Sequence, residues 1–176
     1  MTGPALLLQE FIHLFTSEKM RGPVLDLACG DCSNGILVAA HDQDVVCYDK
    51  SRESLEAARE CASKAGVRIT VREVDLEVEG ADPLPAEAFG GILVFRYLHR
   101  PLIPCIRKAL RPSGILIYET YTLEQRRFGK PMNADHLLKP GELMSWFLDW
   151  EIIHSFEGIL ENPARAMSQL VCRKLI

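Results

Sequence analysis

The chain lacks both an excess of basic residues and a long hydrophobic run, and each absence argues against a class of protein. Its 176 residues carry 20 lysines and arginines against 24 aspartates and glutamates, which gives a net charge of −4. A domain that binds nucleic acid mainly through phosphates is usually basic, so this balance argues against that class. The longest apolar runs are short pieces such as Gly91–Phe95, far below the roughly 18 residues that span a bilayer. We therefore expect neither a membrane span nor a nucleic-acid partner.

A secretory signal and a zinc-binding cysteine framework are also missing. No basic region precedes Leu6–Leu8, and Gln9 and Glu10 soon follow, so we expect a cytoplasmic protein. Cys29 and Cys32 form a C-x-x-C pair, but no second pair follows, so we expect no metal site. Most of the six cysteines lie in apolar or helical stretches of a chain with its own core, which indicates reduced thiols.

The sequence does contain a regular alternation of strand and helix patterns. Its 48% hydrophobic residues are typical of a globular protein, and we expect a single domain over residues 1–176. We expect strands at 24–27, 44–48, 67–74, 91–95 and 115–121, and helices at 5–16, 33–41, 51–64 and 101–110. Loops or turns are expected at 77–88, 111–114 and 122–140, a short helix at 141–147, and terminal strands at 150–156 and 166–173. This order predicts an α/β fold: a Rossmann-like, doubly wound, mostly parallel seven-stranded sheet with helices on both faces and an antiparallel C-terminal strand.

Small and acidic residues follow the expected strands at the edge where such sheets bind ligands. Ala28, Gly30 and Cys32 come directly after the first strand, and their small size lets a ligand approach the backbone. Asp49 closes the second strand, where a carboxylate can accept hydrogen bonds from both ribose hydroxyls. Asp75 closes the third, where it could read an adenine amino group. Each aspartate alone is also typical of a helix cap or turn, but together they predict a nucleotide-type cofactor.

Five motifs across the chain resemble those of class I S-adenosylmethionine-dependent methyltransferases. They are V-L-D-L-A-C-G at 24–30, Y-D-K-S at 48–51, V-D-L-E at 74–77, G-G-I-L-V-F-R-Y-L-H at 90–99 and A-L-R-P-S-G-I-L-I-Y-E-T at 109–120. Within that superfamily, L-L-K-P-G-E-L at 137–143 and the following Trp150 look like the tellurite-resistance-type branch.

The resemblance implies S-adenosylmethionine as the cofactor and assigns its binding residues position by position. Asp26 would orient the amino group of the methionine moiety. Ala28, Cys29 and Gly30 would line the methionine and ribose, and Asp49 would hold the ribose hydroxyls. Lys50, Asp75 and Leu76 would surround the adenine, and Phe95 would lie near the methyl group. The family usually has glycine at the positions of Ala28 and Cys32, so this chain departs from it at both.

The segment that follows the fourth strand carries the candidate catalytic residues. Arg96 and Arg100 could clamp an anionic acceptor such as a carboxylate, phosphate or oxyanion. His99 is the candidate general base, with Tyr97 second. The alternative interpretation is that His99 and Arg100 only cap the next helix and pair with surface carboxylates. The loop at 122–140 is either a lid that excludes water or a plain basic surface loop.

These features favour in-line methyl transfer to a small, anionic or soft acceptor, such as a chalcogen or oxyanion. Asn-Pro-Pro-Tyr and Asp-Pro-Pro-Tyr, the motifs of amino methylation on nucleic-acid bases, are absent. Methylation of RNA or protein is an alternative, as is a non-catalytic protein that binds S-adenosylmethionine. The sequence leaves the acceptor and the oligomeric state open.

Overall fold

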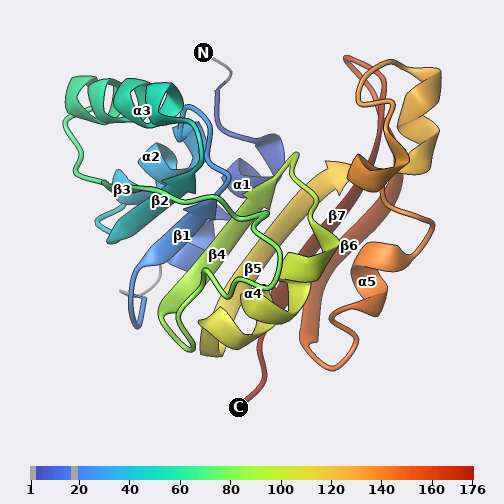
Figure 1. Ribbon diagram of the computed structural model, residues 1–176. Coiled ribbons are helices and arrows are strands. Elements are labelled where there is room, and N and C mark those ends of the chain that lie inside the picture. Colours follow the sequence, from blue (N-terminus) through green and yellow to red (C-terminus); the bar gives the residue numbers. More distant parts are fainter. Residues whose placement is uncertain (1–2, 17–19) are drawn as a thin grey trace.

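Parallel pairing of five strands builds most of one seven-stranded sheet with the order β3-β2-β1-β4-β5-β7-β6 (Figure 1). The computed structural model describes residues 3–16 and 20–176. The strands are β1 Val24–Leu27, β2 Val45–Asp49, β3 Thr70–Glu73, β4 Phe89–Phe95, β5 Leu110–Tyr121, β6 Glu151–Leu160 and β7 Arg165–Arg173. β7 runs antiparallel to both β5 and β6. The predicted doubly wound sheet with an antiparallel C-terminal strand is confirmed.

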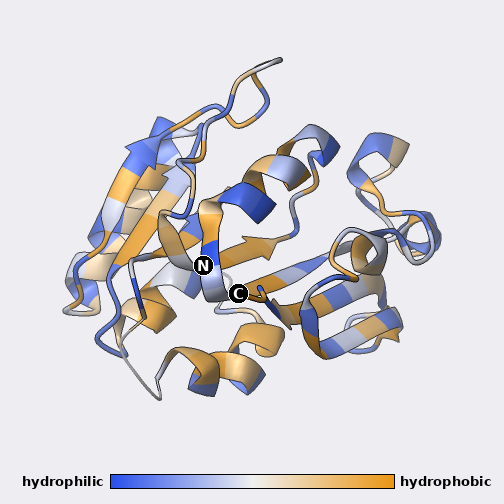
Figure 2. Ribbon diagram, turned by 90° about the horizontal axis from the view of Figure 1, so that it is seen from below, coloured by the Kyte–Doolittle hydropathy of each residue, from blue (hydrophilic) through white to orange (hydrophobic). Residues whose placement is uncertain are grey.

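Helices cover both faces of the sheet. They are α1 Leu6–Phe11, α2 Ser33–Ala39, α3 Arg52–Lys64, α4 Ile103–Ala109 and α5 Glu142–Ser145, with 3-10 turns η1 Ile12–Phe15, η2 Arg100–Leu102, η3 Leu123–Arg127 and η4 Ala134–His136. One buried cluster joins the strands to α4 and α5, and a second joins them to α1, α2 and α3. Apolar residues accordingly concentrate in the central strands (Figure 2). No helix within residues 3–16 and 20–176 has the length and apolar character needed to cross a membrane.

Strands β1 and β4 lie side by side at the centre, and the chain winds outward from them in opposite directions. Every residue of both strands is buried, as expected for parallel strands covered on two faces. Gly91 is required there, because a Cβ would lie 2.6 Å from the Phe15 ring. Ligands bind where the winding of such a sheet reverses, so the carboxyl ends of β1 and β4 are the place for a site.

Several element boundaries differ from the sequence prediction. The helix expected over 5–16 tightens into the 3-10 turn η1 after Phe11. The turn expected at 111–114 lies inside β5, as a bulge between the pairs Phe89–Leu110 and Gly91–Ile115. Both terminal strands extend further than their apolar patterns indicate. The hydrogen-bonded pairing of β6 with β7, rather than the alternation of hydrophobic and polar residues within each strand, sets their length.

Candidate functional site

The turn that leaves β1, residues 28–32, is held in an unusual backbone conformation. Ala28, Gly30 and Cys32 have φ angles of 53°, 53° and 55°, and only one of the three is glycine. A left-handed conformation costs a residue with a side chain about 1 kcal/mol. The Cys32 amide donates to the carbonyl of Cys29 at 2.9 Å, which closes the turn. Backbone strain of this kind concentrates at ligand sites, so the turn is a candidate binding element.

Asp26 lies in β1 directly behind this turn and is buried, with 1% of its surface exposed. Its Oδ2 accepts a hydrogen bond from the Gly35 amide at 2.8 Å. Burial raises the pKa of the Asp26 carboxyl to about 7, and the nearby carboxylates of Asp31 and Asp49 add to the rise. A cationic ligand group would favour the charged form of this buried carboxyl, and the pairing of the two charges would stabilise the bound ligand.

Asp49, at the end of β2, fixes the turn to the second strand. Its Oδ2 accepts from the Gly30 amide and its Oδ1 from the Ser51 amide, both at 2.8 Å. The Cys29 amide also donates to the Tyr48 carbonyl at 3.0 Å. Each carboxylate oxygen has a second lone pair, so Asp49 can brace the turn and still accept from ligand hydroxyls.

Three cavities adjoin at the carboxyl ends of β1, β2 and β4. The Asp26 cavity, of about 300 Å³, is lined by Asp26, Ala28, Cys29, Gly30, Asp31, Ser33, Asn34, Phe95 and Arg96. The Asp49 cavity, of about 230 Å³, is lined by Ala28, Asp49, Lys50, Val74, Asp75, Leu76, Glu77 and Tyr97. The loop cavity, of about 640 Å³, is lined by Glu77, Arg96, Tyr97, Leu98, Tyr121, Lys130, Pro131, Met132, Asn133 and His136. Arg96 lines both the Asp26 cavity and the loop cavity, and Tyr97 lines both the Asp49 cavity and the loop cavity, so the loop cavity adjoins the other two.

All nine residues expected to bind the cofactor line the Asp26 cavity or the Asp49 cavity. Ala28 belongs to both cavities and therefore lies between them. Lys50 forms an ion pair with Glu77 at 3.3 Å, and Asp75 accepts from the Glu77 amide at 2.9 Å, so the rim of the Asp49 cavity is already organised. The structure thus brings the nine residues together around two cavities that share Ala28.

Tyr97 has a buried hydroxyl that makes no hydrogen bond to any residue in the described part of the chain. Burial and the nearby Glu77 carboxylate raise the pKa of Tyr97 above its usual range. Its hydroxyl is therefore a hydrogen-bond donor rather than a base at neutral pH. A buried donor beside the Glu77 carboxylate, without a well-formed hydrogen bond to it, fits a ligand that supplies a better-placed acceptor between the Asp49 cavity and the loop cavity.

Arg100 does not line the loop cavity, which corrects the expectation of a free clamp. Its Nε and Nη2 donate to the two carboxylate oxygens of Glu142, at 2.7 and 2.8 Å. The same guanidinium donates to the carbonyls of Asp135 and Leu137, both at 2.9 Å. Arg100 therefore fastens the loop and α5 to the exit of β4. His99 lies at the N-cap of η2 and also lines none of the three cavities, whereas His136 lines the loop cavity.

We expect Arg100→Ala to lower the free energy of unfolding by about 2 kcal/mol, because a bidentate, partly buried ion pair and two carbonyl contacts are lost. Arg100 lowers the pKa of Glu142, so this stability is present above the unfolded carboxyl value and disappears as the pH falls through the folded one. Denaturant unfolding at pH 7 and at pH 3 measures both effects. Arg52→Ala, which breaks an exposed pair with Glu56, is the matched control, with a loss below about 0.5 kcal/mol. Equal losses in the two variants would contradict the assignment.

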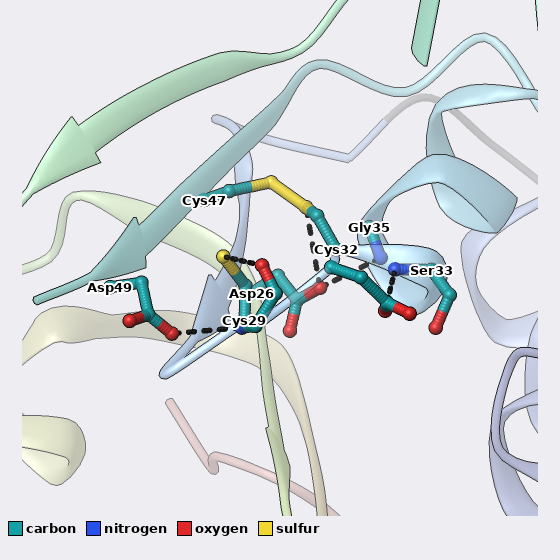
Figure 3. The surroundings of a disulfide bond; sticks show 9 residues. Asp26, Cys29, Cys32, Ser33, Gly35, Cys47 and Asp49 are labelled. Atoms are coloured by element: carbon teal, nitrogen blue, oxygen red, sulfur yellow. Dashed lines mark hydrogen bonds between the residues drawn. A yellow bond between two sulfur atoms is a disulfide. The ribbon is translucent and has the colours of Figure 1, made fainter. Parts of the chain in front are cut away.

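The structure also corrects the expectation that all cysteines are reduced. Cys32, which caps α2, forms a disulfide with Cys47 of β2 (Figure 3). Both cysteines are fully buried, while Cys29 has a free, partly exposed thiol that lines the Asp26 cavity. The pairing joins the turn to β2 beside Asp26.

Several cavity-lining residues lay outside the sequence interpretation. Glu77 and Asn133 line the loop cavity, and Asn34 lines the Asp26 cavity. Asn34 is also buried and accepts from the Ala5 amide at 2.8 Å. The Asn133 position depends on the loop folding back on β5, where Thr122 bridges to Leu138. No local sequence pattern predicts that the loop folds back on β5. Glu77, by contrast, could have been selected because it belongs to the V-D-L-E motif.

Comparisons with known proteins agree with this geometry. A family model described as a methyltransferase domain matches residues 24–114, just over half of the chain. TehB from Haemophilus influenzae has a similar structure, with a TM-score of 0.81 and 18% identity over 99% of this chain; the chain spans 63% of the length of TehB. A SAM-dependent methyltransferase from Methanosarcina mazei gives a TM-score of 0.72 and 15% identity over 94% of this chain and 97% of its own. One from Mesorhizobium loti gives 0.69 and 18%, with the same coverage. No curated protein matches the sequence.

Proposed function

Since this chain belongs to the methyltransferase domain family and takes S-adenosylmethionine as its cofactor, we propose that it methylates a small anionic or soft acceptor held in the loop cavity. The observation that carries the proposal is that the loop cavity shares Arg96 with the Asp26 cavity and Tyr97 with the Asp49 cavity. Two of these cavities contain the cofactor-binding residues, and the third opens beside them. A volume of about 640 Å³ suits a small molecule.

The charge of the loop cavity indicates the acceptor class. Arg96, Lys130 and His136 line it together with one carboxylate, that of Glu77. Glu77 already pairs with Lys50, so the cationic groups outweigh it. Met132 and Pro131 add a soft, apolar wall. This combination supports a small carboxylate, phosphate or chalcogen oxyanion. The similarity to TehB supports placing the chain in the tellurite-resistance-type branch.

Each residue of the site has a distinct part in the proposed reaction. S-adenosylmethionine, when bound, supplies a methyl group that is already activated for transfer. Asp26 holds the amino group of the methionine moiety, and Asp49 holds the ribose. Arg96 orients the acceptor, while the Tyr97 hydroxyl donates a hydrogen bond between the Asp49 cavity and the loop cavity. A soft acceptor needs no base. An oxygen or nitrogen acceptor would give its proton to His136, the imidazole that lines the loop cavity, in place of His99.

The cytoplasm is the proposed location. Cys29, Cys105 and Cys172 are free thiols, which supports a reducing compartment.

The test begins with calorimetry of S-adenosylmethionine and S-adenosylhomocysteine, followed by a radiolabelled-methyl screen of small carboxylates, phosphates and selenium and tellurium oxyanions. Binding of both cofactor forms, with transfer to an anion, is the expected result. Binding without transfer to any acceptor would favour a non-catalytic binding protein, and absence of binding would overturn the function. Transfer to RNA with a steep salt dependence would redirect the acceptor assignment.

We expect Lys130→Gln to raise KM for an anionic acceptor about fivefold and to leave the Kd of S-adenosylhomocysteine unchanged, because Lys130 lines only the loop cavity. Arg127→Gln removes the same charge from the same loop at a position outside the three cavities. It is the matched control and should leave KM unchanged. Equal effects of the two substitutions on KM would mean that only the general charge of the loop matters.

A further inference from the structure

Three sulfur atoms meet beside the cofactor-binding turn. The Sγ atoms of Cys29, Cys32 and Cys47 all lie within 4.8 Å of one another, and Cys32 and Cys47 are joined (Figure 3). Cys32 ends the turn and Cys47 lies in β2, two residues before Asp49. A Cβ on Gly35 would lie 2.7 Å from the Cys32 sulfur and 3.1 Å from both Asp26 Oδ2 and the Cys47 sulfur. The disulfide therefore packs directly against the carboxylate expected to hold the cofactor.

The redox state of Cys32 decides which groups can donate to Asp26. The Cys32 Sγ lies 3.5 Å from Asp26 Oδ2, within hydrogen-bonding distance for a thiol. A disulfide sulfur carries no hydrogen, so in the oxidised form it faces the carboxylate with lone pairs only. The Gly35 amide then remains as the donor to that oxygen. Reduction supplies an S–H donor beside the carboxylate, which stabilises its charged form.

We propose that Cys32 and Cys47 are a site of reversible oxidation that sets the affinity for S-adenosylmethionine, with the reduced pair as the high-affinity form. This inference rests on the proposed function of the Asp26 cavity. In the oxidising direction, hydrogen peroxide takes two electrons from the two thiols, the S–S bond forms, and two molecules of water leave. In the reducing direction, a dithiol returns two electrons and two protons, breaks the S–S bond and becomes a cyclic disulfide.

The turn stays attached to β2 when the disulfide opens. The Gly30 amide to Asp49 and the Cys29 amide to the Tyr48 carbonyl link the same two segments without any sulfur. Reduction therefore adds a donor to Asp26 and preserves the two backbone ties of the turn. This balance sets the sign of the effect: oxidation weakens cofactor binding.

Cys29 gives the buried pair its connection to solvent. Cys32 and Cys47 have no exposed surface, whereas Cys29 lines the Asp26 cavity and is within reach of both sulfurs. Burial and the Asp26 and Asp49 carboxylates raise the pKa of the Cys29 thiol above its usual range, so its thiolate is scarce and exchange through it is slow. A bound cofactor would cover this route.

The experiment compares the full chain after long incubation with hydrogen peroxide or with a water-soluble phosphine, each state verified by mass spectrometry of the peptides that contain Cys32 and Cys47. Calorimetry with S-adenosylhomocysteine at pH 6 should give a Kd about tenfold lower for the reduced form, because the Asp26 carboxyl, with a pKa of about 7 in the oxidised form, is mostly protonated there and the S–H donor keeps it charged. Cys47→Ala keeps the Cys32 thiol and cannot form the Cys32–Cys47 bond, so after reduction it should bind as the reduced wild type does. Cys105→Ser, on α4, is the matched control and should respond as the wild type does.

Equal affinities in the two states, tighter binding by the oxidised form, or absence of a Cys32–Cys47 peptide after oxidation would each overturn the proposal. A second readout separates it from the proposed function. The Asp26 carboxyl, followed by carbon-detected NMR without ligand, should titrate at a lower pH in the reduced protein. If neither state binds S-adenosylhomocysteine, the proposed function fails, and the NMR shift still decides whether the sulfur pair controls Asp26.

Discussion

Replacing Asp26 by asparagine will weaken S-adenosylhomocysteine binding about 100-fold, or about 2.7 kcal/mol. The carboxylate is buried and lines the cavity that would receive the amino group of the ligand. Asparagine has the same shape and can still accept from the Gly35 amide, so the substitution removes the charge while the contact that holds β1 to α2 remains. Calorimetry at pH 8 measures the loss, because the wild-type carboxyl is ionised there.

Two observations distinguish a lost ligand contact from a damaged fold in this variant. The asparagine variant should unfold at the same or a higher denaturant concentration than the wild type at pH 8, because burying the carboxylate costs free energy in the unliganded protein. Asp42→Asn, on an exposed turn with the same left-handed backbone, should bind as the wild type does. A fall in stability that matches the fall in affinity would assign Asp26 a structural role.

Lowering the pH from 8 to 5 will weaken S-adenosylhomocysteine binding by the wild type about 100-fold. The carboxyl of Asp26 has its pKa raised to about 7 by burial, so it takes up a proton below neutrality and loses its attraction for the ligand ammonium. One linked proton gives about a tenfold change per pH unit below that value. Calorimetric titrations across this range should therefore be flat above pH 8 and steep below 7.

The unliganded protein should show the opposite trend. The folded-state pKa of Asp26 lies above its unfolded value, so the native state binds more protons between about 4 and 7. The contribution of Asp26 to stability is therefore greatest below that window and declines as the pH rises through it. Asp26→Asn removes both dependences. A steep pH profile of affinity in that variant would place the titrating group elsewhere, with Asp31 and Asp49 as the neighbouring carboxyls.

Strand positions could be predicted from the sequence because burial on both faces leaves a direct record in it. Val24–Leu27 and Gly91–Phe95 are apolar runs interrupted only by Asp26, and both lie within central strands. The charged side chain inside such a run already marks Asp26 as a residue with a specific task. The residues expected to bind the cofactor lie in or directly after the strands, and the topology rule and the motif resemblance together predicted nine residues that line two adjoining cavities.

The disulfide and the acceptor side could not be predicted in the same way, because both depend on tertiary contacts. Cys32 and Cys47 are 15 residues apart, and pairing requires the turn to fold back over β2. Arg100 looked like a free cation because its partner Glu142 is 42 residues away. The loop cavity forms only when residues 130–136 return to the exit of β4. The sequence showed which side chains at these positions could form a bond or an ion pair, but it did not show with which residue each would pair.

Because β7 is the last strand of the chain, the two halves of the proposed site are completed at different stages of synthesis. The strands that carry the cofactor residues, β1 to β4, end at Phe95 and pair with one another. The loop cavity depends on β7, because the amide of Thr122 donates to the Ala166 carbonyl and the Ala166 amide donates to Gln125. In the proposed function, the residues that would hold the methyl donor are therefore synthesised before Ala166, whose contacts hold the proposed acceptor cavity in place.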